Sequence, residues 1–268
     1  MANVRKNTLK PLILAVETSG RLGSVAIAAG PNMLAETEFS AALRHSAEIF
    51  TAADRLLKDF GGRPDQIEQI YISAGPGSFT GLRIAVTIAK IMHLANDTKI
   101  VALDTLDLIA QNAIDYIKAE KKTIDSIAVV LDAKRGQFFI SVYENKNLRP
   151  SDAKNAGAKR GPKFEAATAA STLSGWTKIL PSSLMTAGHF VTQFADAQRP
   201  LWLLGEGLVY YKDKFKAGGI EFFDESLWTP KASKVHRIGW EKALQGQFAE
   251  PVSLVPVYIQ RPDIRIKK

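Results

Sequence analysis

The sequence contains no cysteine, and this absence excludes disulfide bonds, thiolate metal sites and cysteine nucleophiles. Histidine is scarce as well. No two of the four histidines have the i, i+4 spacing that holds a metal on a helix. The Gly-x-Ser-x-Gly elbow of serine hydrolases does not occur. We therefore expect neither a catalytic residue nor a metal site in this chain.

Long apolar runs are missing too. The run from Leu12 to Val16 ends at Glu17 and is too short for the apolar region of a signal peptide. No run approaches the roughly 18 apolar residues that cross a bilayer. We expect a soluble, cytoplasmic protein without membrane contact. With 46% hydrophobic and 23% charged residues among 268, the chain can bury a substantial core and form about two domains.

The positive charge is concentrated in three segments. Residues 1–10, 146–165 and 261–268 carry +3, +4 and +3 of the formal net charge of +8, so the rest of the chain is about −2. Such segments can attract RNA by releasing counterions, and solvated tails explain them equally well. No stripe of alternating basic and aromatic residues indicates a dedicated nucleic-acid surface.

Short apolar segments and helical periodicity alternate along the first half of the chain. They predict strands over residues 12–16, 24–28, 33–39, 69–73 and 100–103, and helices over residues 43–60, 79–95 and 105–118.

The pattern then restarts. Strands are predicted over residues 127–131 and 137–143, and helices over residues 208–216 and 234–244. Each half thus begins with a buried strand, a polar glycine-containing turn and a returning strand, which indicates a duplicated α/β fold. We expect a flexible tail over residues 1–11, a first lobe over residues 12–120 and a second lobe over residues 121–268. Residues 146–175 lack periodicity and are interpreted as a mobile insertion.

A glycine-rich stretch from Gly75 to Arg83 joins a predicted strand to a predicted helix. The glycines allow a sharp turn, Ser78 can cap the helix, and helix N-terminal amides favour an anion. The stretch is no Walker A loop, because the Gly-Lys-Ser/Thr ending is missing. We favour the alternative to an anion site, in which the stretch is a tight strand-to-helix turn that binds no ligand.

The helix that follows has few polar residues. Arg83, Thr87 and Lys90 form one narrow stripe, and His93 is the other polar side chain. A helix this apolar is buried on most of its surface, either in the core or against a partner. The sequence leaves these two possibilities equal.

Two polar turns, Glu17–Gly23 and Asp132–Gly136, occupy equivalent places in the two halves. Such turns could hold the phosphates of a nucleotide bound between the halves, and two ordinary hairpins are the alternative. With the Gly-x-Gly turn of the second half, the candidate residues for nucleotide phosphates are Thr18, Ser19, Asp132, Lys134, Gly205 and Gly207.

Several motifs together resemble the TsaB (YeaZ) family, which belongs to the actin/Hsp70/sugar-kinase (ASKHA) superfamily. The stretch GPGSFTGLR within Ser73–Ile84 is the most specific, and a glutamate, Glu17, takes the place of the usual aspartate after the first strand. The match is good over residues 12–145 and thin over residues 146–250. The matching stretches are Ile13–Ser19, Arg44–Glu48, Ser73–Ile84, Ala102–Asp107, Leu131–Gln137 and Pro256–Ile259.

The resemblance implies a two-lobed, duplicated ASKHA-like fold that serves as a non-catalytic partner of a TsaD-like catalytic subunit in tRNA threonylcarbamoyladenosine formation at position 37. It also implies a TsaE-like ATPase as a further partner and tRNA contacted indirectly, and it leaves either a monomer or a homodimer for the isolated chain. No cofactor is required, with ATP or ADP expected at or near the subunit interface.

The resemblance bears on individual residues as well. The sister family TsaD carries a metal-binding His-x-x-x-His where this chain has Thr105 and Ile109, so the metal site is not expected here. Family members make their partner contact through helices of the first lobe. We expect Ile88 and Ile91 to face outward. The expected interface residues are Ile49, Leu56, Phe79, Arg83, Ile84, Ile88 and Ile91.

Two other functions compete with this one. A small-molecule kinase or nucleotide-binding ATPase of the same fold would need catalytic carboxylates and should hydrolyse ATP alone. A metal-dependent glycoprotease would need the missing histidine pair.

Overall fold

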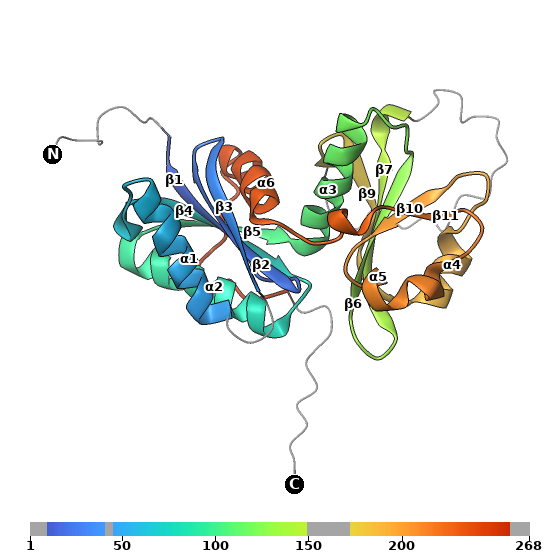
Figure 1. Cartoon of the computed structure of the whole chain (residues 1–268), viewed down its shortest axis with the longest axis horizontal. Helices are drawn as coiled ribbons and strands as arrows, with labels where there is room; N and C mark the ends of the chain where they lie inside the picture. Colours follow the sequence, from blue (N-terminus) through green and yellow to red (C-terminus); the bar gives the residue numbers. More distant parts are fainter. Residues whose placement is uncertain (1–9, 41–44, 149–171, 258–268) are drawn as a thin grey trace, which may run out of the picture. The chain divides into compact units, whose positions relative to one another are not determined.

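The computed structural model describes residues 10–40, 45–148 and 172–257 (Figure 1). The described chain divides into two compact units. The first contains the residues up to Leu108 together with Pro230–Val257, and the second contains Ile109–Thr229. Within the described residues, no helix has both the length and the apolar character needed to cross a membrane.

The first unit is built on a five-stranded sheet in the order β3-β2-β1-β4-β5. The strands β1 (Leu12–Glu17), β2 (Leu22–Ala29) and β3 (Asn32–Ser40) form an antiparallel meander. The strands β4 (Ile67–Gly75) and β5 (Lys99–Asp104) continue the sheet parallel to β1. Because β1 is covered on both faces, its residues from Leu12 to Val16 form a continuous apolar run rather than an alternating one.

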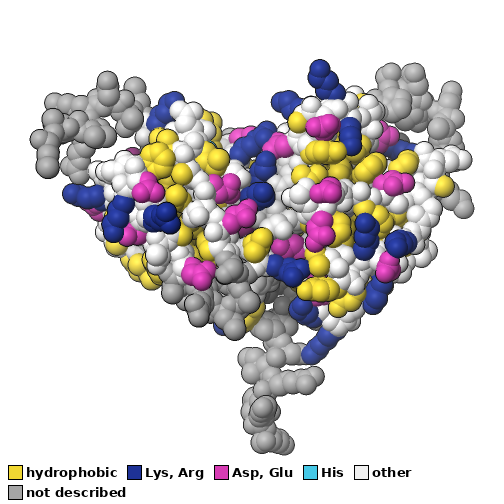
Figure 2. Space-filling view, in the orientation of Figure 1, with side chains coloured by type: hydrophobic (Ala, Val, Ile, Leu, Met, Phe, Trp, Pro, Cys, Tyr) yellow, Lys and Arg dark blue, Asp and Glu magenta, His cyan; other side chains and the backbone are white. Residues whose placement is uncertain are grey.

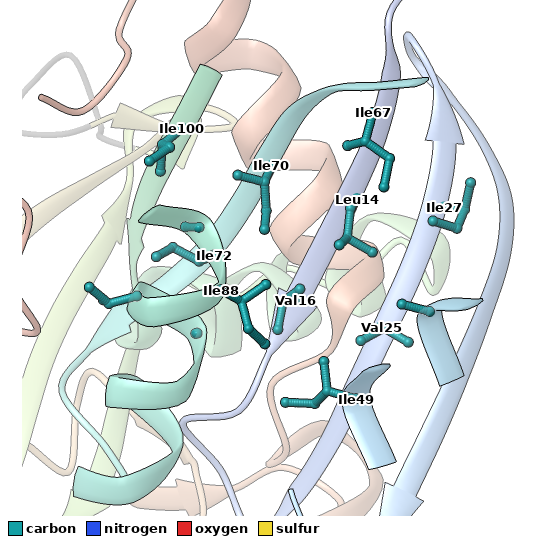
Figure 3. Packing of buried hydrophobic residues seen from close by; sticks show 14 of the residues in the cluster. Leu14, Val16, Val25, Ile27, Ile49, Ile67, Ile70, Ile72, Ile88 and Ile100 are labelled. Carbon is teal, nitrogen blue, oxygen red and sulfur yellow. The ribbon is translucent and has the colours of Figure 1, made fainter. Parts of the chain in front are cut away.

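Helices cover both faces of this sheet (Figure 1). On one face lie α1 (His45–Asp59) and α2 (Phe79–Asn96), and on the other lies α6 (Ala232–Leu244). Side chains that alternate along the strands, such as Leu14 and Val16, point into the core beneath α1 and α2 (Figure 3). On the opposite face Gly239 of α6 lies directly against the ring of Tyr71.

The second unit repeats this plan. Its sheet has the order β11-β10-β6-β7-β9-β8, with β6, β7 and β9 antiparallel and β10 and β11 parallel to β6. Apart from the added edge strand β8, the order matches that of the first sheet. The strands are β6 (Ser126–Asp132), β7 (Gln137–Asn145), β8 (Thr172–Leu173), β9 (Trp176–Thr186), β10 (Leu201–Leu204) and β11 (Ile220–Phe222).

One long helix, α3, and several short helices complete the fold. The α-helices are α3 (Thr105–Ala119), in which the first unit passes into the second, α4 (Ala187–Phe194) and α5 (Leu208–Tyr211), and the 3-10 helices are η2 (Pro64–Gln66), η3 (Lys146–Leu148), η4 (Lys212–Phe215) and η5 (Glu225–Leu227). The repeated sheet topology confirms the predicted two-lobed, duplicated ASKHA-like α/β fold.

The predicted lobe boundaries require correction. Residues 230–257 were assigned to the second lobe, whereas they belong to the first unit. The helix α6 packs across all strands of the first sheet, and the chain beyond it donates backbone hydrogen bonds from Ala249 to Ile100 and from Val257 to Ala74. The change from the first unit to the second also falls inside α3 rather than after it.

Some local predictions were incomplete. The strand β9, the helix α4 and the strand β11 were not predicted, and the predicted helix 208–216 is a turn of α-helix followed by a 3-10 turn. Of the predicted mobile insertion 146–175, residues 146–148 form η3, and residues 172–175 form β8 and the turn into β9. The remainder lies outside the described residues.

Candidate functional site

The glycine-rich loop packs directly on the turn between β1 and β2. The amide of Ser78 donates to the carbonyl oxygen of Ser19 over 2.8 Å, and the Thr18 hydroxyl donates to the carbonyl oxygen of Gly81, also over 2.8 Å. A Cβ on Gly77 would lie 2.5 Å from the carbonyl oxygen of Ser19. The glycines are therefore needed because two backbone segments touch here, in agreement with the tight-turn interpretation.

The predicted phosphate donors of this turn are engaged inside the protein. Thr18 and Ser19 are buried. The amide and the hydroxyl of Ser19 both donate to Oε1 of Glu17 over 2.5 Å, and Glu17 itself is fully buried at the end of β1. In this conformation the hydroxyl protons of Thr18 and Ser19 already have acceptors within the protein.

The matching turn of the second unit is more open. Lys134 is exposed and donates from its ammonium group to Oδ2 of Asp132 over 2.8 Å, and this hydrogen bond raises the pKa of Lys134. Gly205 and Gly207 pack against the end of β6, where the amide of Gly207 donates to the carbonyl oxygen of Val130 over 3.0 Å. Each set of phosphate candidates thus lies at the end of the first strand of its own unit, and a nucleotide between the units stays a prediction.

An apolar groove of about 360 Å³ lies between α1 and α2. Its rim contains three exposed apolar side chains: Phe50 is 57% exposed, Ile91 54% and Phe79 38%. The guanidinium carbon of Arg83 lies 3.7 Å from the centre of the Phe79 ring, so the charged group shares the edge of the groove with an aromatic face. The lining residues are Phe50, Phe79, Thr80, Arg83, Ile84, Thr87, Ile88 and Ile91.

Three of the expected interface residues face the core instead. Ile49, Leu56 and Ile88 are buried and belong to the cluster beneath α1 and α2; Figure 3 shows Ile49 and Ile88 among these core side chains. The expectation that Ile88 faces outward was wrong, since this side chain forms part of the floor of the groove. Phe79, Arg83, Ile84 and Ile91 line the groove, and their place in a partner interface stays a prediction.

Sequence reasoning missed Phe50, Thr80 and Thr87 as groove residues. The sequence around Phe50 contains a pattern that bears on where its side chain lies. It directly follows Ile49, which belongs to the buried helical stripe, and neighbouring helix positions are about 100° apart. Phe50 therefore lies at the border of the buried face, and it is exposed although Ile49 is buried.

The positions that correspond to the metal ligands of the sister family are internal to the fold. Thr105 and Ile109 are both fully buried on α3. Among residues 10–40, 45–148 and 172–257 no group of three or more His, Asp or Glu side chains could hold a metal ion. The buried His236 has a structural contact, because its Nε2 donates to the carbonyl oxygen of Gly30 over 2.8 Å and its ring stacks on Tyr71.

Two repeated units of one sheet topology define a two-lobed protein of ASKHA-like fold, and the first unit carries an apolar groove on two of its helices. The chain belongs to the TsaB family. It is 32% identical over 95% of its length, and over 96% of the relative, to the tRNA threonylcarbamoyladenosine biosynthesis protein TsaB of Bacillus subtilis.

Other comparisons agree with this assignment. TsaB of Escherichia coli is 23% identical over 92% of this chain and 94% of the relative. The structure of YeaZ from Pseudomonas aeruginosa superposes with a TM-score of 0.68 at 20% identity, covering 93% of this chain and 100% of that one, and it supports the fold. Residues 39–159 match the family model described as TsaD: tRNA N6-adenosine threonylcarbamoyltransferase.

Proposed function

We propose that this chain is a non-catalytic subunit of the cytoplasmic machinery that forms threonylcarbamoyladenosine on tRNA, and that the groove between α1 and α2 docks on a TsaD-type catalytic subunit. The observation that carries the proposal is this groove in a chain of the TsaB family. Curated members of the family are named as biosynthesis proteins of this nucleoside.

The groove has the composition of a protein interface. Phe50, Phe79 and Ile91 keep large apolar areas in water at its rim, and burying such area contributes roughly 25 cal/mol per Å². Arg83 and the hydroxyls of Thr80 and Thr87 supply a polar edge. Aromatic anchors, an arginine and a polar rim are typical of residues that dominate binding energy.

The non-catalytic role is supported by the two positions on α3. Thr105 and Ile109 replace the histidine pair of the sister family, and both side chains are sealed in the interior, where they cannot reach a substrate. In this proposal the TsaD-type subunit performs the transfer, a TsaE-like ATPase joins the complex, and this chain supplies the docking surface. It requires no cofactor of its own.

Reconstitution tests the proposal. This chain is co-expressed with the TsaD-type protein of the same genome, and the complex is isolated through a tag on this chain. Threonylcarbamoyladenosine in tRNA is then measured by mass spectrometry of nucleosides, with and without this chain. We expect a stable complex and a modification that depends on it. A TsaD-type protein that neither binds nor needs this chain contradicts the proposal.

The same preparation addresses the remaining alternatives. The isolated chain should not hydrolyse ATP with sugars or short acids, whereas a kinase of this fold should turn over alone. Repeating the pull-down with ATP or ADP tests whether a nucleotide at the subunit interface changes the affinity. Size-exclusion chromatography of the isolated chain over a range of concentrations tests whether it forms a homodimer.

A further inference from the structure

A second surface, on the second unit, combines the exposed ring of Tyr210 and the partly buried ring of Tyr211 with cationic side chains. It is formed by the turn between β6 and β7 and by the segment α5–η4. We call it the basic aromatic surface, and it consists of Lys134, Arg135, Tyr210, Tyr211 and Lys214.

An aromatic cluster holds the two parts of this surface together. The buried ring of Phe138, at the start of β7, makes edge contacts with Tyr211 at 5.4 Å and with Phe215 at 5.0 Å between ring centroids. Phe215 in turn contacts the buried ring of Phe190 at 5.8 Å. Since these rings pack α5–η4 against the β6–β7 hairpin, the side chains of the surface are presented from a rigid base.

The side chains themselves extend into water. The Lys134 side chain is 83% exposed, and Tyr210 is 71% exposed. Lys134 and Arg135 both adopt positive φ angles, 68° and 55°, so the tight turn places them next to each other at the tip of the hairpin. The ammonium group of Lys214 lies 5.1 Å from the centre of the Tyr211 ring.

Positive charge outweighs negative charge around these rings. Asp132 pairs with Lys134 at 2.8 Å, and Asp213 pairs with Lys216 at 2.6 Å. Across residues 132–136 and 206–216 five lysines and arginines stand against three acidic residues. These two segments together therefore carry a formal charge of +2. Figure 2 shows several Lys and Arg side chains in dark blue at this end of the second unit.

We propose that the basic aromatic surface binds unpaired nucleotides of tRNA. A base stacks on the exposed ring of Tyr210, and Lys134, Arg135 and Lys214 pair with the flanking phosphates. The inference rests on the proposed function, and it replaces the expectation of an only indirect contact with tRNA by a direct one. Unstacked bases and phosphates are the groups that aromatic rings and cations recognise in single-stranded RNA.

The surface fits RNA better than the other anionic partners. An acidic peptide would match the cations and leave the exposed tyrosine ring without a flat partner. A free nucleotide would need donors for its phosphates in an enclosed site, whereas the Gly207 amide already donates to Val130 and the Tyr210 ring is open to solvent.

The test measures binding of a fluorescent, unmodified tRNA transcript to the full chain by anisotropy over a range of salt concentrations. Tyr210→Ala should weaken binding by about fivefold or more, because stacking of one base is lost, and Tyr210→Phe should bind like the original chain. Arg135→Glu should weaken binding and lower the slope of log K against log salt by about one.

Lys118→Glu is the matched control. It makes the same change of charge on an exposed residue at the end of α3, which leads into the opposite end of β6. It should leave tRNA binding unchanged. Equal binding by Tyr210→Ala and Tyr210→Phe overturns the inference, and so does an equal loss in Arg135→Glu and Lys118→Glu.

A parallel pull-down with the TsaD-type subunit separates the two proposals. All four variants should capture it, because none of them lies in the groove. If the chain captures the subunit and no variant differs in tRNA binding, this inference fails and the proposed function stands. If neither the original chain nor any variant captures the subunit, the proposed function fails, whatever the result of the tRNA measurement. Loss of ATP binding in Tyr210→Ala with unchanged tRNA binding also overturns the inference.

Discussion

Thr18 and Gly81 lie in direct backbone contact: the Thr18 hydroxyl donates to the carbonyl oxygen of Gly81 over 2.8 Å, and a Cβ on Gly81 would lie 1.8 Å from the carbonyl oxygen of Thr18. This contact joins the β1–β2 turn to the first turn of α2. It fixes where α2 begins, and therefore where its exposed residues and the groove lie.

Replacing Gly81 by alanine should consequently destabilise the protein by about 1–3 kcal/mol, since neither backbone segment can move away without disturbing its own hydrogen bonds. Denaturant unfolding measures the effect. Gly188→Ala is the control, because Gly188 is exposed in α4 and a Cβ there meets nothing within 4 Å. That variant should be stabilised by about 0.5–1 kcal/mol. Equal unfolding midpoints for the two variants would show that the contact is not restrictive.

The buried side-chain amide of Asn112 holds the end of the second unit in place. Nδ2 of Asn112 donates to the carbonyl oxygens of Leu227 over 3.0 Å and Thr229 over 2.8 Å, just before the chain returns to the first unit. Asn112→Ala should destabilise the protein by about 1–3 kcal/mol, because two carbonyl groups lose their donor. Asn96→Ala removes an exposed amide from the end of α2 and should change the stability by less than about 0.5 kcal/mol. Thermal unfolding of the two variants compares them, and a similar small change in both would contradict this role of Asn112.

His236 should make stability depend on pH. Burial lowers the pKa of His236 below its ordinary value of 6.5. The unfolded chain therefore takes up a proton at a higher pH than the folded one. The stabilisation is fully present above 6.5 and is lost as the pH falls through the lower folded value.

The measurement compares unfolding free energies at about pH 7.5 and about pH 5.5. The original chain should lose more stability on acidification than His236→Gln, whose amide can still donate to Gly30 without titrating. The same loss in both proteins would assign the pH dependence to other groups.

Much of the fold could be predicted from local patterns. β1 and β6 are buried apolar strands, and Ser78 caps α2 as expected, its hydroxyl accepting from the amide of Gly81. The strand β9 escaped prediction because Pro181 interrupts its apolar pattern. Pro181 lies at the register shift opposite Ser141, where a strand can accommodate a residue without an N–H. The register shift that accommodates Pro181 becomes visible only when β9 is paired with β7.

The place of α6 could not be predicted for a different reason. Its sequence shows an amphipathic helix, and nothing in it specifies which of two sheets it covers. The choice is made by contacts across more than half of the chain: Gly239 fits against Tyr71, and the amide of Ala232 donates to the hydroxyl of Ser24 over 2.8 Å.

The candidate site was predicted to the level of the helix and not of the side chain. The few polar residues of α2 pointed to this helix, and they left open whether its apolar surface is buried in the core or against a partner. Ile88 and Ile91 are both apolar on that helix, and only packing against the sheet separates the 4% exposed Ile88 from the 54% exposed Ile91.

The difference in exposure between Ile88 and Ile91 predicts different effects of substitution on stability. Ile88→Glu should destabilise the protein by more than about 2 kcal/mol, because it removes core packing and buries a carboxylate among apolar side chains. Ile91→Glu should change the stability by less than about 0.5 kcal/mol. Circular dichroism during denaturant unfolding measures both variants. A folded and fully stable Ile88→Glu protein would mean that this side chain is not part of the core.

The affinity of the chain for the TsaD-type subunit, measured by isothermal titration calorimetry, tests the central claim most directly. Ile91→Glu should weaken binding at least tenfold, or about 1.4 kcal/mol, because a carboxylate at the groove rim would have to be buried against apolar groups. Leu244→Glu introduces the same charge at a 68% exposed apolar position of α6, on the opposite face of the sheet, and should bind like the original chain. Undiminished binding by the folded Ile91→Glu protein, or an equal loss in both variants, would contradict docking through the groove between α1 and α2.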